Sequence, residues 1–174
     1  MHFLMGFDGH YAMPAAVTLR SLGGSLRPGE NATIHVLAVE IDNEDRGRIE
    51  RSLPPSLDIR WYDFDVDHIA GLPISSMSDE VYITRTAYTL LFLDRYLPAE
   101  IDRVLFLDAD TLVRSSPADL FETDLGGCAL GAVQDFGCPA IGLPKGVAGW
   151  RELGLDGRLP AFNTGFLLID RPVW

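Results

Sequence analysis

Basic residues are scarce in this sequence of 174 residues. Lys and Arg total 14 against 25 Asp and Glu, which gives a formal net charge of -11. So acidic a chain lacks the basic surface that neutralises a phosphate backbone, and we expect no nucleic-acid partner. The charge also disfavours nonspecific adhesion to anionic lipid, although a basic patch in a segment beyond this sequence would still allow peripheral membrane contact.

Cysteine is also rare, and long apolar runs are absent. Cys128 and Cys138 stand at a spacing that fits neither a zinc ribbon nor a redox pair, so we interpret them as free, mostly buried thiols. No apolar run reaches the roughly 18 residues of a membrane span. The stretch from Met1 to Phe7 is too short for a secretory signal. The simplest expectation is a cytoplasmic protein whose membrane association, if any, is peripheral.

The hydrophobic content of 47% is enough for one substantial core, so residues 1–174 are expected to form a single domain. Short apolar runs alternate with helical patterns, which predicts an α/β fold with a mostly parallel sheet flanked by helices. The expected strands are 3–7, 33–39, 57–64, 104–107, 128–133 and 163–169. The first expected helix spans 11–22 and is stopped by Gly23-Gly24, and the second begins with Asp42 as N-cap and Asp45 three residues on and ends at Pro54-Pro55. The third spans 81–96, after a weak capping box at 76–79, and ends before Pro98. A fourth helix is opened by Ser116-Pro117.

Two carboxylates follow the most apolar of these strands. Val104–Leu107 runs directly into Asp108-Ala109-Asp110, which places the pair at the carboxyl edge of a strand, where open α/β sheets bind ligands. Side chains at i and i+2 can turn toward one hard cation and leave coordination sites for phosphate oxygens and water. Their mutual repulsion gives a bound cation a role. The alternative is that both residues simply cap a turn.

Five segments together resemble glycosyltransferase family 8, which includes bacterial lipopolysaccharide galactosyl- and glucosyltransferases and glycogenin. These segments cover nearly the entire chain and are residues 7–11, 83–88, 103–113, 131–135 and 161–169. The resemblance implies a GT-A (Rossmann-like) fold, Mn²⁺ or Mg²⁺ bound by Asp108 and Asp110, and a UDP-sugar donor. It further implies transfer of a hexose, galactose or glucose, to a glycan or lipopolysaccharide acceptor with retention at the anomeric carbon.

The resemblance also assigns residues to the donor site. Asp8 would receive the uracil, and His10, which stands where the family usually has Asn, would lie near the ribose. Tyr11 and Ala109 belong to the same donor-binding segments. Arg85 would lie near the donor sugar and the diphosphate. Read without the resemblance, Asp8 is a turn cap, His10 a loop residue and Arg85 a solvated charge on a helix.

Asp135 and Asn163 match residues that the family uses to hold the sugar and the acceptor hydroxyls, and with Arg85 they form the expected catalytic set. The alternatives are a strand-end cap for Asp135 and a turn former for Asn163. Departure of UDP leaves negative charge on the diphosphate, which the metal and Arg85 would stabilise. No carboxylate is an evident covalent nucleophile, so same-face attack by the acceptor is favoured over double displacement.

The sequence departs from the family at two places. Leu90 occupies a position where many members carry another arginine. The family also continues well beyond the segment around Asn163, through an acidic D-Q-D segment and a distal H-x-x-G-x-x-K-P-W motif whose histidine completes the metal site. This sequence stops at Trp174, which predicts either a fragment of a longer enzyme or a short form. Peripheral membrane contact would then come from the absent segment.

Three other functions are alternatives to sugar transfer. A noncatalytic or incomplete UDP-sugar-binding fragment would keep the donor site without turnover. A phosphatase of the haloacid-dehalogenase type also has an apolar strand followed by D-x-D, but it needs Thr where this chain has Leu112. A dinucleotide-dependent oxidoreductase is disfavoured because no G-x-G-x-x-G follows a strand.

Overall fold

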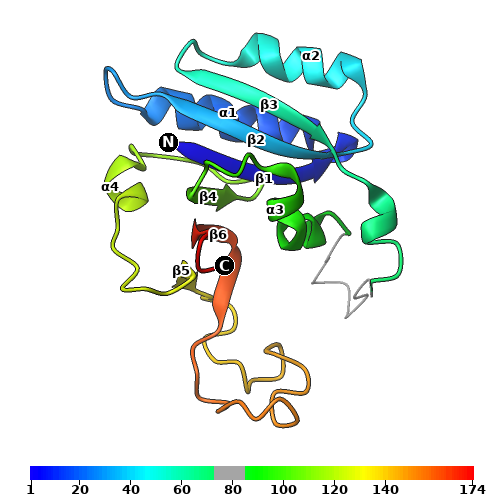
Figure 1. Cartoon of the computed structure of the whole chain (residues 1–174), viewed down its shortest axis with the longest axis vertical. Coiled ribbons are helices and arrows are strands. Elements are labelled where there is room, and N and C mark those ends of the chain that lie inside the picture. The colour runs from blue at the N-terminus through cyan, green and yellow to red at the C-terminus, as the bar shows by residue number, and fades with distance from the viewer. Residues whose placement is uncertain (73–84) are drawn as a thin grey trace.

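The computed structural model describes residues 1–72 and 85–174, and its centre is a six-stranded sheet with helices on both faces (Figure 1). Strand order in the sheet is β3-β2-β1-β4-β6-β5. The strands are β1 (His2–Asp8), β2 (Ala32–Val39), β3 (Leu57–Asp63), β4 (Arg103–Leu107), β5 (Leu130–Gln134) and β6 (Phe162–Asp170). The α-helices are α1 (Ala12–Ser25), α2 (Asn43–Ser52), α3 (Leu93–Tyr96) and α4 (Ala118–Phe121), and the 3₁₀ helices are η1 (Gly9–Tyr11), η2 (Val66–His68) and η3 (Arg85–Phe92).

The sheet is mostly parallel, as predicted. Strands β3, β2, β1 and β4 run in one direction, whereas β6 pairs antiparallel with both β4 and β5. Because β6 is reversed, its first residues lie at the edge where the parallel strands end. This arrangement brings residues from both halves of the chain to one edge of the sheet.

Two apolar clusters cover the two faces, and β1 contributes to both because side chains alternate along a strand. Phe3, Met5 and Phe7 pack in the cluster beneath α1 and α2. Leu4 packs on the other face with the residues of η3 and α3. Burial of this kind contributes on the order of 2 kcal/mol for each large side chain, so the clusters hold the strands in register.

Helix α1 corrects the prediction that Gly23-Gly24 end the first helix. The helix continues through both glycines to Ser25. A methyl group at Gly23 would overlap Pro54 Cγ and lie 3.2 Å from Leu57 Cδ1. The glycine therefore permits close packing of α1 against the start of β3. In α2 the predicted cap is confirmed, because the Asp42 side chain accepts a hydrogen bond from the Asp45 amide at 2.8 Å.

The predicted helix over 81–96 is not one α-helix. Its described part is the 3₁₀ helix η3 followed by the short α3, which ends at Tyr96 as Pro98 requires. Thr89 Oγ1 donates to the Thr86 carbonyl at 2.7 Å, and such local bonds from Thr compete with the regular α-helical ladder. Residues 81–84 and the predicted capping box at 76–79 lie outside the described residues.

Two smaller predictions also need correction. The helix predicted to have Pro117 at its first position begins one residue later, at Ala118, and is short; Ser116 Oγ accepts a bond from the Ala118 amide at 3.2 Å. Both cysteines are free, but only Cys138 is buried. Cys128 is exposed and precedes β5, which begins at Leu130 and is itself half-buried to exposed. None of the helices within residues 1–72 and 85–174 combines the length and apolar character needed to cross a bilayer.

A chain of polar rings crosses β1, β2 and β3 with the buried His35 at its centre, and it predicts a pH dependence of stability. His35 is 2% exposed; its Nε2 lies 3.1 Å from His2 Nδ1 and its Nδ1 lies 3.0 Å from the Tyr62 hydroxyl. Burial, with a smaller effect of the His2 charge, lowers the pKa of His35 to about 4 from an ordinary value of 6.5. Between about pH 6.5 and pH 4, His35 is therefore protonated in the unfolded chain but neutral in the folded chain.

We expect the free energy of unfolding to fall by about 3 kcal/mol as pH decreases from 7 toward 4, because of His35 alone. Urea unfolding at a series of pH values measures this. His35→Gln should flatten the profile in this window, even if it lowers stability at pH 7. A profile of equal slope in both proteins would contradict the assignment.

Candidate active site

Predicted site residues from four segments meet at one edge of the sheet. Leu4 of β1 pairs with Phe106 of β4, so Asp8 and the acidic pair that follows β4 lie at neighbouring strand ends. The first residues of β6, including Asn163, reach the same edge, because Leu107 pairs with Phe166. Asp135 follows β5, which pairs with β6 at this end through Gln134 and Phe162. The fold thus brings together carboxylates and an amide that are far apart in the sequence.

Asp108 is held directly against β6. Its amide donates to the Gly165 carbonyl at 2.8 Å, and Asn163 Oδ1 accepts from the Gly165 amide, also at 2.8 Å. A methyl group at Gly165 would overlap Asp108 Oδ2 and lie 2.8 Å from Asp108 Cγ and 3.0 Å from Asn163 Oδ1. The Asp108 carboxyl group therefore occupies space that is free only because residue 165 is glycine.

The acidic pair is electrostatically strained. Partial burial, and then the negative charge of Asp110, raise the pKa of the Asp108 carboxyl group above its usual range. Taken as whole residues, Asp108 and Asp110 are both exposed, whereas Ala109 between them is buried. A cation bound by both carboxylates would favour their charged forms.

The loop that carries these acids is fastened to α1 by hydroxyl groups, which the sequence did not reveal. Thr18 Oγ1 donates to the Ala109 carbonyl at 2.8 Å. Ser21 Oγ accepts from the Val113 amide at 2.9 Å and donates to the Thr18 carbonyl at 2.7 Å. The sequence did contain one indication of this role. Thr18 lies between Ala15 and Leu22 on the buried face of α1, where an apolar residue is usual.

Asp8 and His10 lie where β1 passes into η1. Asp8 Oδ1 accepts from the His10 amide at 3.0 Å, and the His10 ring nitrogen Nδ1 lies 3.5 Å from the same oxygen. The His10 side chain is 94% exposed, and Tyr11 is 37% exposed. Asp8 therefore caps the turn, and the rings of His10 and Tyr11 are left accessible to a ligand at this edge.

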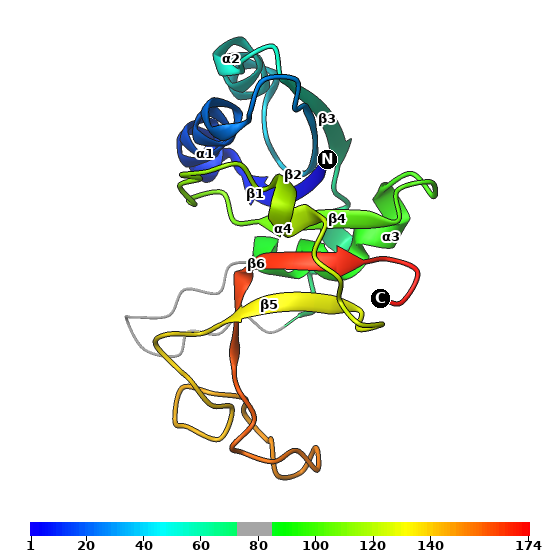
Figure 2. The same ribbon diagram turned by 90° about the vertical axis from the view of Figure 1, so that its left-hand side faces the viewer.

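Asp135 stands at the base of a long arm, residues 135–161, which extends away from the sheet between β5 and β6 (Figure 2). Its Oδ1 accepts from the amides of Gly137 and Cys138 at 2.7 and 3.0 Å, and its own amide donates to the Ala161 carbonyl. Asn163 likewise accepts a backbone N–H from two residues further on, but it lies within β6, so the alternative of a turn former is wrong for Asn163. Phe136, which follows Asp135, is fully exposed.

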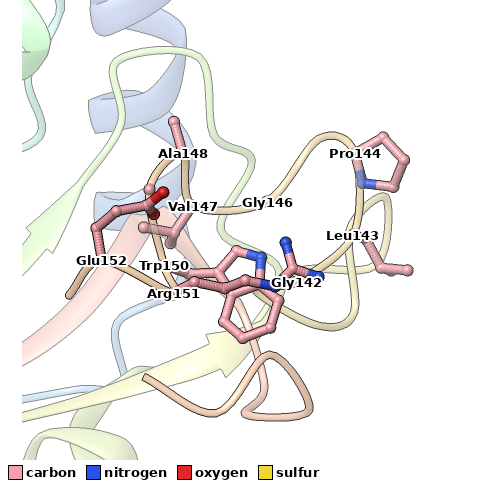
Figure 3. Close-up of a pocket in the computed structure, with 10 residues that line it drawn as sticks. Gly142, Leu143, Pro144, Gly146, Val147, Ala148, Trp150, Arg151 and Glu152 are labelled. Atoms are coloured by element: carbon pink, nitrogen blue, oxygen red, sulfur yellow. The ribbon is translucent and has the colours of Figure 1, made fainter. Parts of the chain in front are cut away.

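The hollows formed by the described residues include two in the segments just described. One, of about 340 Å³, separates α1 from the acidic loop and is lined by Met13, Pro14, Val17, Thr18, Asp110, Thr111 and Leu112. The other, of about 320 Å³, is formed by residues of the arm alone; Figure 3 shows Arg151 beside Trp150, with its guanidinium carbon 4.1 Å from the ring centroid. Only the first hollow adjoins a predicted metal ligand, and its walls are mostly apolar.

Arg85 cannot be placed in the site in the same way. Its backbone begins η3, but its side chain lies outside the described residues. Within the described part of the chain, no group of three or more His, Cys, Asp or Glu side chains forms a candidate metal site. Asp108 and Asp110 are a two-residue donor set.

A mostly parallel sheet with an acidic pair after its fourth strand and a reversed strand beside it is the architecture of a GT-A glycosyltransferase. The chain matches glycosyl transferase family 8 over residues 2–174 and belongs to that family. The recognition made from the motifs is therefore confirmed. Family membership rules out the haloacid-dehalogenase-type phosphatase and the dinucleotide-dependent oxidoreductase.

Relatives with described activities span this chain almost completely. The probable galacturonosyltransferase-like protein 6 of Arabidopsis thaliana is 30% identical over 100% of the chain and 51% of its own length. The lipopolysaccharide 1,3-galactosyltransferase of Salmonella typhimurium is 26% identical over 97% of the chain and 48% of its own length. The crystal structure of the galactosyltransferase LgtC with donor and acceptor sugar analogues has a TM-score of 0.83 and 30% identity, covering 100% of this chain and 59% of that one. The chain spans about half the length of the curated relatives it matches.

Proposed function

We propose that residues 1–174 form a single nucleotide-sugar-binding domain that takes part in metal-dependent transfer of a hexose, galactose or glucose, from a UDP-sugar to a glycan or lipopolysaccharide acceptor. The observation that carries this proposal is the convergence of Asp8, Asp108, Asp135 and Asn163 on one sheet edge in a family 8 chain. A cytoplasmic location and peripheral membrane contact remain predictions.

The donor set suits Mn²⁺ or Mg²⁺. Asp108 and Asp110 offer hard oxygen ligands, and the raised pKa of Asp108 reflects burial and a neighbouring negative charge that a divalent cation would offset. Two protein ligands leave coordination sites for diphosphate oxygens and water. When bound, the cation supplies positive charge that stabilises the departing diphosphate.

The remaining residues bind and orient the reactants. Asp8 accepts a hydrogen bond from the uracil, and His10 and Tyr11, both accessible, contact the nucleoside. Arg85 approaches the diphosphate and the donor sugar. Because Oδ1 of Asp135 and Oδ1 of Asn163 each accept a backbone amide from two residues further on, each side chain is held in one orientation with its other polar atom available to a sugar hydroxyl. The acceptor hydroxyl then attacks from the face that UDP leaves, with retention.

Proton NMR of the reaction mixture tests this function. The purified chain, UDP-galactose or UDP-glucose, a lipopolysaccharide oligosaccharide as acceptor and Mn²⁺ should give UDP and a new α-anomeric signal, with no reaction in EDTA. Release of UDP with formation of a β-linked product would contradict retention. Absence of turnover together with metal-dependent UDP binding would instead support the second candidate, a noncatalytic or incomplete UDP-sugar-binding fragment.

A further inference from the structure

The acidic loop has little regular structure of its own, so its shape depends on a few bonds to other elements. Residues 108–117 form no helix or strand. Asp108 is bonded to Gly165, and the Thr111 amide makes a long bond of 3.4 Å to the Asp108 carbonyl. Asp110 is exposed, so neighbouring side chains do little to fix its direction. The backbone on either side of Asp110 must therefore set where its carboxylate points.

Two hydroxyls of α1 hold the backbone on those two sides. Thr18, only 1% exposed, donates to the carbonyl of Ala109 just before Asp110. Ser21 accepts from the amide of Val113, three residues after Asp110, and its own proton goes to the Thr18 carbonyl. The two bonds span the segment 109–113 and come from one turn of a helix whose apolar face is anchored in the core. Helix α1 thereby holds the loop at two points, Ala109 and Val113.

We propose that Thr18 and Ser21 are positioning residues for the acidic pair. Their hydroxyls fix the peptide around Asp110 so that its carboxylate stays beside that of Asp108 and both face one divalent cation. This inference rests on the proposed function, because it assigns these residues a role in cation and UDP binding. A purely structural role would change the stability of the protein and leave that affinity intact.

Matched variants separate these roles. Ser21→Ala removes both the acceptor for Val113 and the bond to the Thr18 carbonyl. Ser25→Ala removes only the counterpart of the second bond, 2.8 Å to the Leu22 carbonyl, one turn further along α1. Thr18→Val keeps the shape of the side chain and removes the donor to Ala109, whereas Thr18→Ser restores a hydroxyl. For each variant we would measure the melting temperature, the affinity for UDP with Mn²⁺, and the exchange rate of the Val113 amide by NMR.

Ser21→Ala and Thr18→Val are expected to weaken Mn²⁺-dependent UDP binding on the order of 10-fold, the scale for groups that orient metal ligands. Thr18→Ser and Ser25→Ala should bind as the unaltered chain does, and Val113 should exchange faster in Ser21→Ala only. Should Thr18→Val not fold, Ser21→Ala still decides the matter. Unchanged UDP affinity in Ser21→Ala overturns the inference alone, whereas an unaltered chain that binds no UDP with Mn²⁺ overturns the proposed function itself.

Discussion

Asp110→Asn is expected to weaken Mn²⁺-dependent UDP binding by roughly 100-fold or more, since even groups that only orient metal ligands contribute 10- to 100-fold. The substitution keeps the size of the side chain but removes one of two anionic ligands. It also removes the charge that helps to raise the pKa of Asp108, so that carboxyl group should titrate at a lower pH in the variant. Calorimetric titration with UDP and NMR titration of Asp108 measure the two effects.

Asp124→Asn is the matched control for this substitution. Asp124 is exposed and accepts a bond from the Gly126 amide at 2.8 Å, in the turn that precedes β5. Because β5 runs from that turn toward Asp135, Asp124 lies at the opposite end of the strand from the site. The Asp124→Asn variant should bind UDP with the same affinity as the unaltered chain. An equal loss in both variants would point to a general effect of charge and count against a metal site at Asp110.

Gly165→Ala is expected to weaken UDP binding with Mn²⁺ by about 10-fold or more while leaving the fold intact. The substitution displaces the Asp108 carboxylate, which is a proposed metal ligand and not a residue that only orients one. The backbone of Gly165 does not have the positive φ that a side chain resists, so the added methyl group is tolerated locally. It would, however, overlap Asp108 Oδ2 and crowd Asn163 Oδ1. The Asp108 carboxylate must rotate away from its present position, and the proposed cation would then lose this ligand.

Gly131→Ala provides the comparison. Gly131 lies in β5, opposite Leu168 of β6, and a methyl group there would lie 2.8 Å from Leu125 Cδ2, the end of a flexible side chain. We expect a small change in melting temperature and unchanged UDP affinity. If Gly165→Ala also kept full affinity, the contact between Gly165 and Asp108 would not control the site.

The strands and the location of the acidic pair could be predicted because they depend on local pattern. The run Val104–Leu107 is apolar throughout because β4 is buried on both faces, and the acids follow where burial ends. The cap of α2 was likewise local, since Asp42 and Asp45 are close in sequence. Family resemblance then predicted which strand ends carry the polar groups of the donor site.

The errors concern packing between elements that are distant in sequence. Gly23 resembles a helix stop until Pro54 is seen against it. The hydroxyl of Thr18 has a partner, Ala109, that no local pattern indicates. Gly165 makes room for Asp108 only because β6 is reversed beside β4. In each case the sequence specifies the residue, but only the tertiary contact explains why that residue is needed.

The central claim is that Asp108 and Asp110 hold a divalent cation through which UDP binds. Calorimetric titration of UDP into the purified chain, with Mn²⁺ and then with EDTA, tests it most directly. Binding with Mn²⁺ that disappears in EDTA is the predicted result. Equal binding in both conditions, or no binding in either, would contradict the claim.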